Sequence, residues 1–400
     1  MQIAGGVYRE LCEAPSWDAE FGSGGRAAAA VSALSPLSTL HTYAHDPHSR
    51  GIRTLQQQGI EVRAHAAVHA VAFSYFHPLS RPHIAPALHE VVQNQPLCVN
   101  GDTVIRFGFV EGDAVVDGSR VVYDPQTQQR AAVFAANGSR ADQLALVLNE
   151  QEMRLLGSSN DLDLAARHIF STQNAAVIVA KRGPRGAAVF ECGGMRHAVP
   201  AYRSAHVFKI GTGDVFTAVF AHHWGERRIP AADAANLASR AVAVYCTNRS
   251  LPPDYKTAPG FSPVSTLPPG RLLLVGSVES LGRRWIMEEA RFRINELGAA
   301  VAAPELDGEE VNERDVAAVL VLADGMSGGS LSRVANAHSI GLPIVVLAET
   351  AMGRELVGLC GSDATVTDDF VSGLYFAVWA AMASRGRRSP LPARHSSTDS

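Results

Sequence analysis

The segment Lys209–Phe216, KIGTGDVF, has the residue types and the spacing that chemistry on a phosphate group requires. Gly211, Thr212 and Gly213 precede an apolar stretch with the pattern of a helix. Glycines before a helix let backbone N–H groups point at one spot, which also faces the positive end of the helix dipole. The turn therefore suits a phosphate or a developing anion, and Asp214 is placed to take a proton from a hydroxyl. The alternative interpretation is a bare helix cap, because one such turn is weak evidence by itself.

Four other short motifs precede this turn in order along the chain. The glycine-rich strand end Gly5–Glu10 is followed by the glycine cluster Gly22–Ala27, which begins an alanine-rich helix. The NEQE segment, Asn149–Glu152, begins a helix after a strand-like run. The KRGPRG segment, Lys181–Gly186, directly follows the continuous apolar strand Ala176–Ala180, which is typical of a strand buried on both faces.

This ordered set resembles the PfkB (ribokinase-like) family of sugar and nucleoside kinases, and the resemblance covers residues 1–260. It implies an ATP-dependent phosphotransferase that acts on a hydroxyl of a sugar or nucleoside, with ATP and Mg²⁺ as cofactors. Asp214 would be the general base, and the turn before it would hold the charge of the transferred phosphoryl group. The resemblance assigns Gly211, Thr212 and Gly213 to this anion hole, Glu10, Gly24 and Gly25 to the acceptor, Lys181, Gly183, Gly186 and Lys209 to the nucleotide, and Asn149 and Glu152 to Mg²⁺ and its waters.

Several positions depart from the family's pattern. Phe208 stands where an acidic residue is usual, so a monovalent cation site is not expected there. Glu10 replaces the common aspartate, and the short stretch between Glu10 and Gly24 predicts a reduced lid. These departures lie on the acceptor side. They leave open a second hypothesis, a catalytically degenerate protein that binds or senses a nucleoside or nucleotide. Asp124, at a strand end, is interpreted either as a residue near the phosphate site or as a loop cap.

Length and composition limit the protein class. A chain of 400 residues predicts two domains, and 46% hydrophobic with 18% charged residues excludes a mainly disordered chain. The net charge of −4 provides no basic field for nucleic acid or an anionic membrane. The longest apolar run, Leu374–Ala383, is too short for a membrane helix. Five scattered cysteines indicate reduced thiols, and we expect a cytoplasmic protein. The alanine- and arginine-rich composition indicates a bacterial source, and a homodimer remains open.

The proline-rich segment 262–270 predicts a linker between two domains, residues 1–261 and 271–384, and the Arg-, Pro- and Ser-rich residues 385–400 predict a disordered tail. Strands alternate with helices in both parts, which predicts an α/β fold class. The expected architecture is a ribokinase-like three-layer α/β/α domain followed by a smaller flavodoxin-like (Rossmann-like) α/β domain. Within the first, we expect several short strands around turns over residues 97–124 and a helix over residues 143–156.

The second part also resembles a known family. A strand followed by Asp324-Gly325, and then Gly328-Gly329-Ser330 before a helix, is similar to the nucleoside 2-deoxyribosyltransferase-like family. An unrelated small Rossmann-like domain is the alternative. Asp324, Ser330 and Arg333 would line a pocket, but Arg333 stands in the place of the family's nucleophilic glutamate. Because an arginine cannot form a glycosyl-enzyme ester, we expect no cleavage of N-glycosidic bonds there.

Overall fold

The computed structural model describes residues 1–126, 133–326, 328–355, 358 and 360–387. The chain forms two compact units, Met1–Pro263 and Val264–Ser400, and their division falls inside the segment 262–270. The end of the expected tail, residues 388–400, lies outside the described residues. Across the described ranges, no helix combines the length and the apolar content that crossing a membrane requires.

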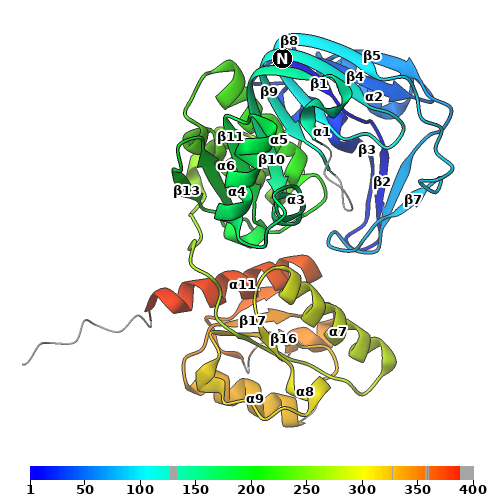
Figure 1. The fold of residues 1–400 in the computed structure, drawn as a ribbon. Helices are drawn as coiled ribbons and strands as arrows, with labels where there is room; N and C mark the ends of the chain where they lie inside the picture. Colours follow the sequence, from blue (N-terminus) through cyan, green and yellow to red (C-terminus); the bar gives the residue numbers. More distant parts are fainter. Residues whose placement is uncertain (127–132, 327, 356–357, 359, 388–400) are drawn as a thin grey trace, which may run out of the picture. The chain divides into compact units, whose positions relative to one another are not determined.

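The first unit is built on one large mixed sheet (Figure 1). All neighbouring strands pair in parallel except at one edge, where β12 runs antiparallel to both of its neighbours. Among the described residues, the nine strands lie in the order β13 (Arg196–Val199), β12 (Ala187–Glu191), β11 (Val177–Lys181), β10 (Arg140–Asn149), β9 (Ala114–Asp124), β8 (Leu97–Phe107), β1 (Gln2–Ala4), β4 (Thr39–Ala44) and β5 (Glu61–Ala66).

Helices cover both faces of this sheet. One buried cluster joins strand residues such as Ile105 and Val147 to α1 (Gly22–Val31), α2 (Arg50–Gln57), α5 (Thr212–Phe220) and α6 (Ala231–Asn248). A second cluster joins the opposite strand face to α3 (Glu150–Leu156) and α4 (Leu162–Gln173). The shorter helical segments of this unit are η1 (Phe134–Asn137), η2 (Gly183–Arg185), the π-helix η3 (Ala221–Glu226) and η4 (Ala258–Gly260). The unit is therefore a three-layer α/β/α domain, and the predicted α/β class is confirmed.

A smaller sheet stands beside the large one, in the order β3 (Trp17–Glu20), β2 (Arg9–Cys12), β6 (Ala72–Tyr75) and β7 (His83–Ala85). Glu10 lies on β2 and is buried. The expectation of a reduced lid considered only the stretch from Glu10 to Gly24, which supplies the β2–β3 pair. The chain adds the β6–β7 pair later, after α1, β4, α2 and β5.

Two predicted segments differ from the structure. Residues 97–124 form two long parallel strands, β8 and β9, which the irregular segment 108–113 connects. Gly101 and Gly118 lie opposite each other inside these strands, where a Cβ on Gly118 would lie 2.8 Å from the Gly101 carbonyl oxygen. The glycines there allow close approach of two backbones rather than a hairpin turn.

The predicted helix over residues 143–156 is a strand followed by a helix. Leu144–Leu148 is buried throughout, as the central strand of a parallel sheet requires. The helix begins only at Glu150, because Asn149 and Glu152 form a capping box that sets its first turn. A continuous apolar run does not distinguish a buried strand from a buried helix.

The second unit has a five-stranded parallel sheet within the described residues, in the order β15 (Val301–Ala302), β14 (Leu272–Val275), β16 (Ala318–Leu322), β17 (Ile344–Leu347) and β18 (Thr365–Thr367). In chain order this is 2-1-3-4-5, the flavodoxin-like arrangement. Residues of α9 (Gly328–Ser339) pack into the core beneath these strands, and α7 (Leu281–Glu296) contacts α11 (Phe370–Arg387). Its shorter segments are α8 (Pro304–Asp307), η5 (Glu313–Asp315) and α10 (Ala351–Glu355).

Strand β1 and helix α1 meet at two glycines. The Gly24 N–H donates to the Gly6 carbonyl at 3.0 Å, and a Cβ on Gly24 would lie 2.4 Å from both the carbonyl carbon and oxygen of Gly5. Gly25 is in a looser place, because its Cβ would be 3.4 Å from the side chains of Leu55 and Val7. Gly24 thus sets how closely the helix approaches the end of β1.

We expect Gly24→Ala to lower the free energy of unfolding by about 1–3 kcal/mol, because the added methyl group would overlap backbone atoms that cannot rotate away. Gly25→Ala is the matched control in the same helical turn. Its contacts are with side-chain methyl groups, and alanine favours a helix over glycine. Urea unfolding of both variants measures the difference. Equal losses of stability would contradict the close approach as the cause.

Candidate active site

The predicted turn lies where several strand ends meet. Asp124, Asn149 and Lys181 end β9, β10 and β11, which are parallel neighbours, so all three residues lie at the same edge of the sheet. The turn itself leads into α5, with Gly211 in the left-handed conformation at φ +79°. Glycine adopts this conformation without strain. The N-terminus of α5 therefore faces the carboxyl edge of the sheet, where α/β proteins bind ligands.

Each residue of the turn contacts one cationic side chain. A Cβ on Gly211 would lie 2.0 Å from Nε of Arg26, so that side chain packs directly on Gly211. The Thr212 hydroxyl accepts a hydrogen bond from Lys209 Nζ at 3.0 Å. A Cβ on Gly213 would be 3.4 Å from Lys181 Nζ. Three positive charges thus surround the helix N-terminus, which is the arrangement that binds a phosphate.

Lys181 is held in place by Asp124. Its Nζ lies 2.5 Å from Asp124 Oδ2, which also accepts a hydrogen bond from the Thr217 hydroxyl at 2.8 Å. Against the effect of burial, the carboxylates of Asp124 and Glu152 raise the pKa of Lys181. Burial and the nearby Lys181 charge lower the pKa of Lys209. Lys181 is therefore a fixed cation, whereas Lys209 is the less firmly charged of the two.

Asp214 is buried, and both of its oxygens have partners. Oδ2 accepts from Arg26 Nη1 at 3.1 Å, and Oδ1 accepts from the exposed Gln126 amide at 2.6 Å. Burial raises the pKa of Asp214 to about 6, although the Arg26 guanidinium acts in the opposite direction. A carboxylate with this pKa is ionised at neutral pH and is close to the range that suits a general base.

Arg26 is the site residue that the sequence prediction missed. Its side chain is fully buried in α1, where Nη1 donates to Glu10 Oε1 at 2.9 Å and Nη2 donates to Glu10 Oε2. The signal was available, because Arg26 is the one charged residue in the run GSGGRAAAAV. A charge inside a buried apolar helix requires a buried partner. Glu10, predicted to face an acceptor, is that partner, and Gly24 packs on Gly5 instead.

Asn149 and Glu152 contact each other in the capping box at the start of α3. The Asn149 side chain accepts from the Glu152 N–H, and Glu152 Oε2 accepts from the Asn149 N–H, both at 2.8 Å. No group of three His, Cys, Asp or Glu side chains that could hold a metal occurs among the residues the structure describes. Mg²⁺ keeps most of its waters and needs only one or two carboxylates beside the phosphates. Asp124 fits this need, because its buried Oδ1 has no hydrogen-bond partner in that part of the chain.

The KRGPRG turn is tied to the start of α3. Glu150 accepts from Arg182 Nε at 2.8 Å and from Arg185 Nη2 at 2.5 Å. Gly186 has φ +74°, and a Cβ there would lie 2.1 Å from the Val199 carbonyl oxygen. Gly183 and Gly186 therefore shape the turn between β11 and β12. Nothing in these contacts assigns the two glycines to a nucleotide.

The predicted pocket of the second unit is only partly assembled. Ser330 Oγ lies 3.2 Å from the Gly276 carbonyl oxygen and 3.3 Å from Glu305 Oε1, and Arg333 Nε lies 3.6 Å from the same carboxylate. Burial raises the pKa of Glu305, a residue that the sequence prediction missed. Asp324 does not join this group. It accepts hydrogen bonds from the backbone N–H of Glu349 and from the Thr350 hydroxyl.

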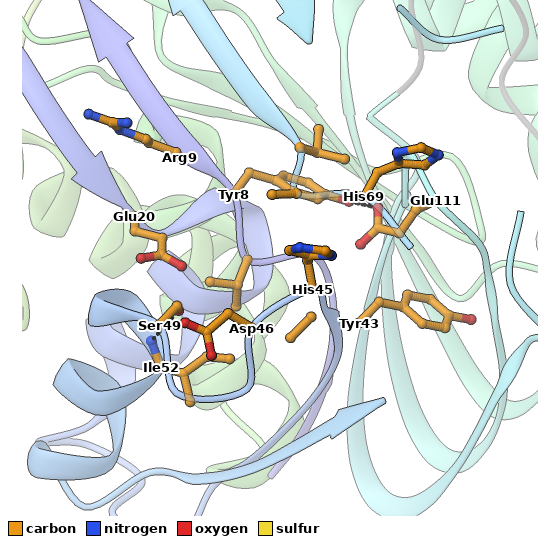
Figure 2. A pocket seen from close by; sticks show the side chains of 14 residues that line it. Tyr8, Arg9, Glu20, Tyr43, His45, Asp46, Ser49, Ile52, His69 and Glu111 are labelled. Carbon is orange, nitrogen blue, oxygen red and sulfur yellow. Dashed lines mark hydrogen bonds between the residues drawn. The ribbon is translucent and has the colours of Figure 1, made fainter. Parts of the chain in front are cut away.

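A cavity of about 200 Å³ lies beside β2 (Figure 2). The Tyr8 hydroxyl donates to Glu111 at 2.6 Å within it, and burial raises the pKa of Glu111. No predicted site residue lines this cavity. Arg9 of β2 belongs to the lining and its neighbour Glu10 does not, because alternate residues of a strand face opposite ways. The lining residues are Val7, Tyr8, Arg9, Glu20, Tyr43, Ala44, His45, Asp46, Ser49, Ile52, His69, Ala70, Val71 and Glu111.

Comparison with protein families gives one match. The model of the pfkB family carbohydrate kinase matches residues 117–256, a segment that is less than half of the chain and that runs from within β9 past α6, including the turn before α5. No curated protein matches the chain in sequence.

Comparison with solved structures gives distant similarities. The fructokinase from Vibrio cholerae O395 bound to fructose, ADP and calcium is 14% identical, with a TM-score of 0.47 over 65% of this chain and 98% of that chain. The ribokinase from Thermotoga maritima is 13% identical, with a TM-score of 0.47 and the same coverage. The ribokinase from Arabidopsis thaliana complexed with ribose and ATP is 13% identical, with a TM-score of 0.47 over 65% of this chain and 97% of that chain.

The raised pKa of Asp214 predicts a pH-dependent stability. Its pKa is about 6 in the folded protein and 3.8 when unperturbed, so the folded state binds the proton more tightly. Between these pKa values, stability from this group falls as pH rises, by up to about 3 kcal/mol in total. Urea unfolding measures this pH dependence. Wild type and Asp214→Asn are compared at pH 4.0 and pH 7.0, which lie on either side of the Asp214 pKa of about 6 in the folded protein. The stability of Asp214→Asn relative to wild type is expected to improve with rising pH, and a constant difference would argue against a raised pKa.

Proposed function

We propose that the first unit is an ATP-dependent phosphotransferase that acts on a hydroxyl of a sugar or nucleoside. The observation that carries this proposal is the turn before α5, where Arg26, Lys209 and Lys181 surround a helix N-terminus beside the buried carboxylate of Asp214. A transferable phosphate needs the positive charges around the helix N-terminus, and a hydroxyl acceptor needs the nearby carboxylate as a base. The pfkB family match supports the proposal, because it spans this turn.

The proposed reaction uses the residues of the turn in two roles. The N–H groups of the turn, with Lys181 and Lys209, bind the terminal phosphate of ATP and neutralise its charge. Asp214 accepts the proton of the acceptor hydroxyl as the acceptor oxygen forms its bond to phosphorus and the bond to ADP breaks. Gln126 is the partner that the acceptor hydroxyl would replace at Oδ1, because it is exposed and lies outside any helix or strand. Asp124 and Glu152 would hold Mg²⁺ through its waters, and the ion supplies charge neutralisation on the phosphates.

A second candidate function is a protein that binds or senses a nucleoside or nucleotide without catalysis. The observation that favours it is the engagement of both Asp214 oxygens and the presence of Arg26 beside the base. A carboxylate that is paired with a guanidinium is a weaker base than a free one. The two functions differ in turnover, since both require ATP or a related nucleotide to bind.

Asp214→Asn is expected to lower the turnover rate by about 10²–10⁴-fold, because an amide cannot take the acceptor proton. The assay measures ADP release with Mg·ATP against a panel of sugars and nucleosides, and calorimetry measures ATP binding. The affinity for ATP should stay within about threefold of wild type, a change in binding free energy of less than 1 kcal/mol. The matched control is Asp142→Asn, an exposed aspartate on β10, which should retain wild-type turnover.

Two results would overturn the assignment. Turnover of Asp214→Asn at the wild-type rate would remove Asp214 as the base. Tight binding of ATP by wild type with no ADP release for any acceptor would favour the binding or sensing function.

We also propose that the second unit binds a nucleoside or nucleotide without cleaving it. Its flavodoxin-like order places Gly276 and Ser330 at the carboxyl edge of β14 and β16, the switch point where such sheets bind ligands. Arg333 pairs with Glu305 there and supplies no nucleophile.

Incubation of the full chain with deoxynucleosides should release no free base, as measured by liquid chromatography. The variant Glu305→Gln removes the carboxylate nearest to Ser330 and serves as the comparison. Base release by wild type that disappears in Glu305→Gln would show a glycosyl-transferring site and contradict the proposal.

A further inference from the structure

Arg26 is an unusual residue to find in the core of a helix. Its side chain is fully buried, and it carries a charge in a helix whose other residues are glycines, alanines, a serine and a valine. Removing such a charge from water is costly, and a buried ion pair often adds no net stability over apolar packing. The presence of Arg26 with two carboxylates therefore calls for a role beyond stability.

The guanidinium lies between the turn and the base. It packs on Gly211, where a Cβ would lie 2.4 Å from its central carbon, and its Nη1 is 3.1 Å from Asp214 Oδ2. In the proposed reaction, the phosphoryl group moves from the donor side of the turn towards the acceptor oxygen beside Asp214. Arg26 lies at the acceptor end of this path, whereas Lys181 and Lys209 contact the other two residues of the turn.

Arg26 also has donors to spare. A guanidinium has five N–H groups. Nη1 is shared among Glu10, Asp214 and the Gly22 carbonyl oxygen, and one N–H of Nη2 is used by Glu10. The buried Nε, which is the atom nearest to Gly211, makes no hydrogen bond within the described chain. Glu10 thus anchors the guanidinium in a fixed orientation, and the buried N–H of Nε lies beside the turn at Gly211.

Cationic and anionic side chains surround the turn before any ligand binds. Arg26, Lys181 and Lys209 lie near four carboxylates, those of Glu10, Asp124, Glu152 and Asp214. When Asp214 takes the acceptor proton it becomes neutral, and Arg26 loses one of its two counter-charges. The negative charge of the transferred phosphoryl group, which lies next to it at that moment, replaces the lost one.

We propose that Arg26 is a catalytic residue that donates a hydrogen bond to the phosphoryl group during transfer and exchanges its partner from Asp214 to that group as the proton moves. This inference rests on the proposed kinase function. The bond between the terminal phosphorus and the bridging oxygen of ATP breaks, the acceptor oxygen bonds to phosphorus, and the acceptor proton goes to Asp214. An arginine in this role contributes about 10³–10⁵-fold to turnover in other phosphoryl-transfer enzymes.

A transition-state mimic tests the proposal without knowledge of the acceptor. Calorimetry on the full chain compares the binding of Mg·ADP alone with that of Mg·ADP plus aluminium fluoride, which imitates the phosphoryl group in flight. We expect wild type to bind ADP much more tightly with the fluoride present. Arg26→Gln should bind ADP alone within about threefold of wild type but lose about 10²-fold or more of the tightening. Arg26→Lys should recover part of it, because the charge returns without the fixed planar geometry.

Two further variants keep the result interpretable. Arg26→Gln leaves two carboxylates buried without a cation, so the double variant Arg26→Gln with Glu10→Gln removes one of them. Its fold is checked by circular dichroism and it should lose the same tightening. Arg167→Gln replaces an exposed arginine on α4 and should behave as wild type. With any acceptor found to be phosphorylated, kcat of Arg26→Gln should fall by about 10³-fold while KM for ATP changes little.

The outcomes separate the two proposals. If wild type fails to bind Mg·ADP, the kinase function itself is wrong and the role of Arg26 falls with it. If wild type binds Mg·ADP and folded Arg26→Gln forms the aluminium fluoride complex as tightly as wild type, the role of Arg26 alone is wrong. A higher turnover in Arg26→Gln would also overturn it, because Arg26 would then block the acceptor position.

Discussion

The buried ion cluster of Glu10, Arg26 and Asp214 is the interaction on which the candidate site depends. It joins β2 of the small sheet, the first turns of α1 and the start of α5, which are far apart in sequence. Breaking one partner of such a cluster leaves an uncompensated charge inside the protein, at a cost of about 3–5 kcal/mol. The three elements are therefore constrained to meet, and the turn before α5 is constrained to lie against Arg26.

The large sheet supplies the second constraint. Its parallel strands bring Asp124 and Lys181 to one edge, where they pair with each other and flank the N-terminus of α5. The close approach of β1 and α1 at Gly5 and Gly24 then sets where Arg26 enters from the other side. The site is thus a layer of alternating charges between the sheet edge and two helix N-termini. In the proposed function, this arrangement would hold a phosphate and a proton acceptor side by side at little reorganisation cost.

Short-range patterns were sufficient for part of the fold and the site. The turn before α5, the start of α3 at Asn149 and the strand before Lys181 follow from local residue chemistry, namely glycine conformation, helix capping and a continuous apolar run. Long-range contacts could not be predicted in the same way. Leu144–Leu148 has the composition of either a helix or a strand, and only its neighbours β9 and β11 make it a strand. The partner of Glu10 was missed for the same reason, since it lies on another element.

The sequence alone determined the α/β class, and it predicted a boundary inside residues 262–270 and a turn at Gly211–Asp214 suited to a phosphate, because each of these rests on neighbouring residues. Only the tertiary structure decided what surrounds that turn. Whether Glu10 contacts an acceptor or a guanidinium depends on which element packs against β2. The contact that Gly24 makes depends in the same way on where the backbone of Gly5, directly after β1, lies. Charge pairing and close packing act between residues that are near in space and distant along the chain, so no local pattern contains them.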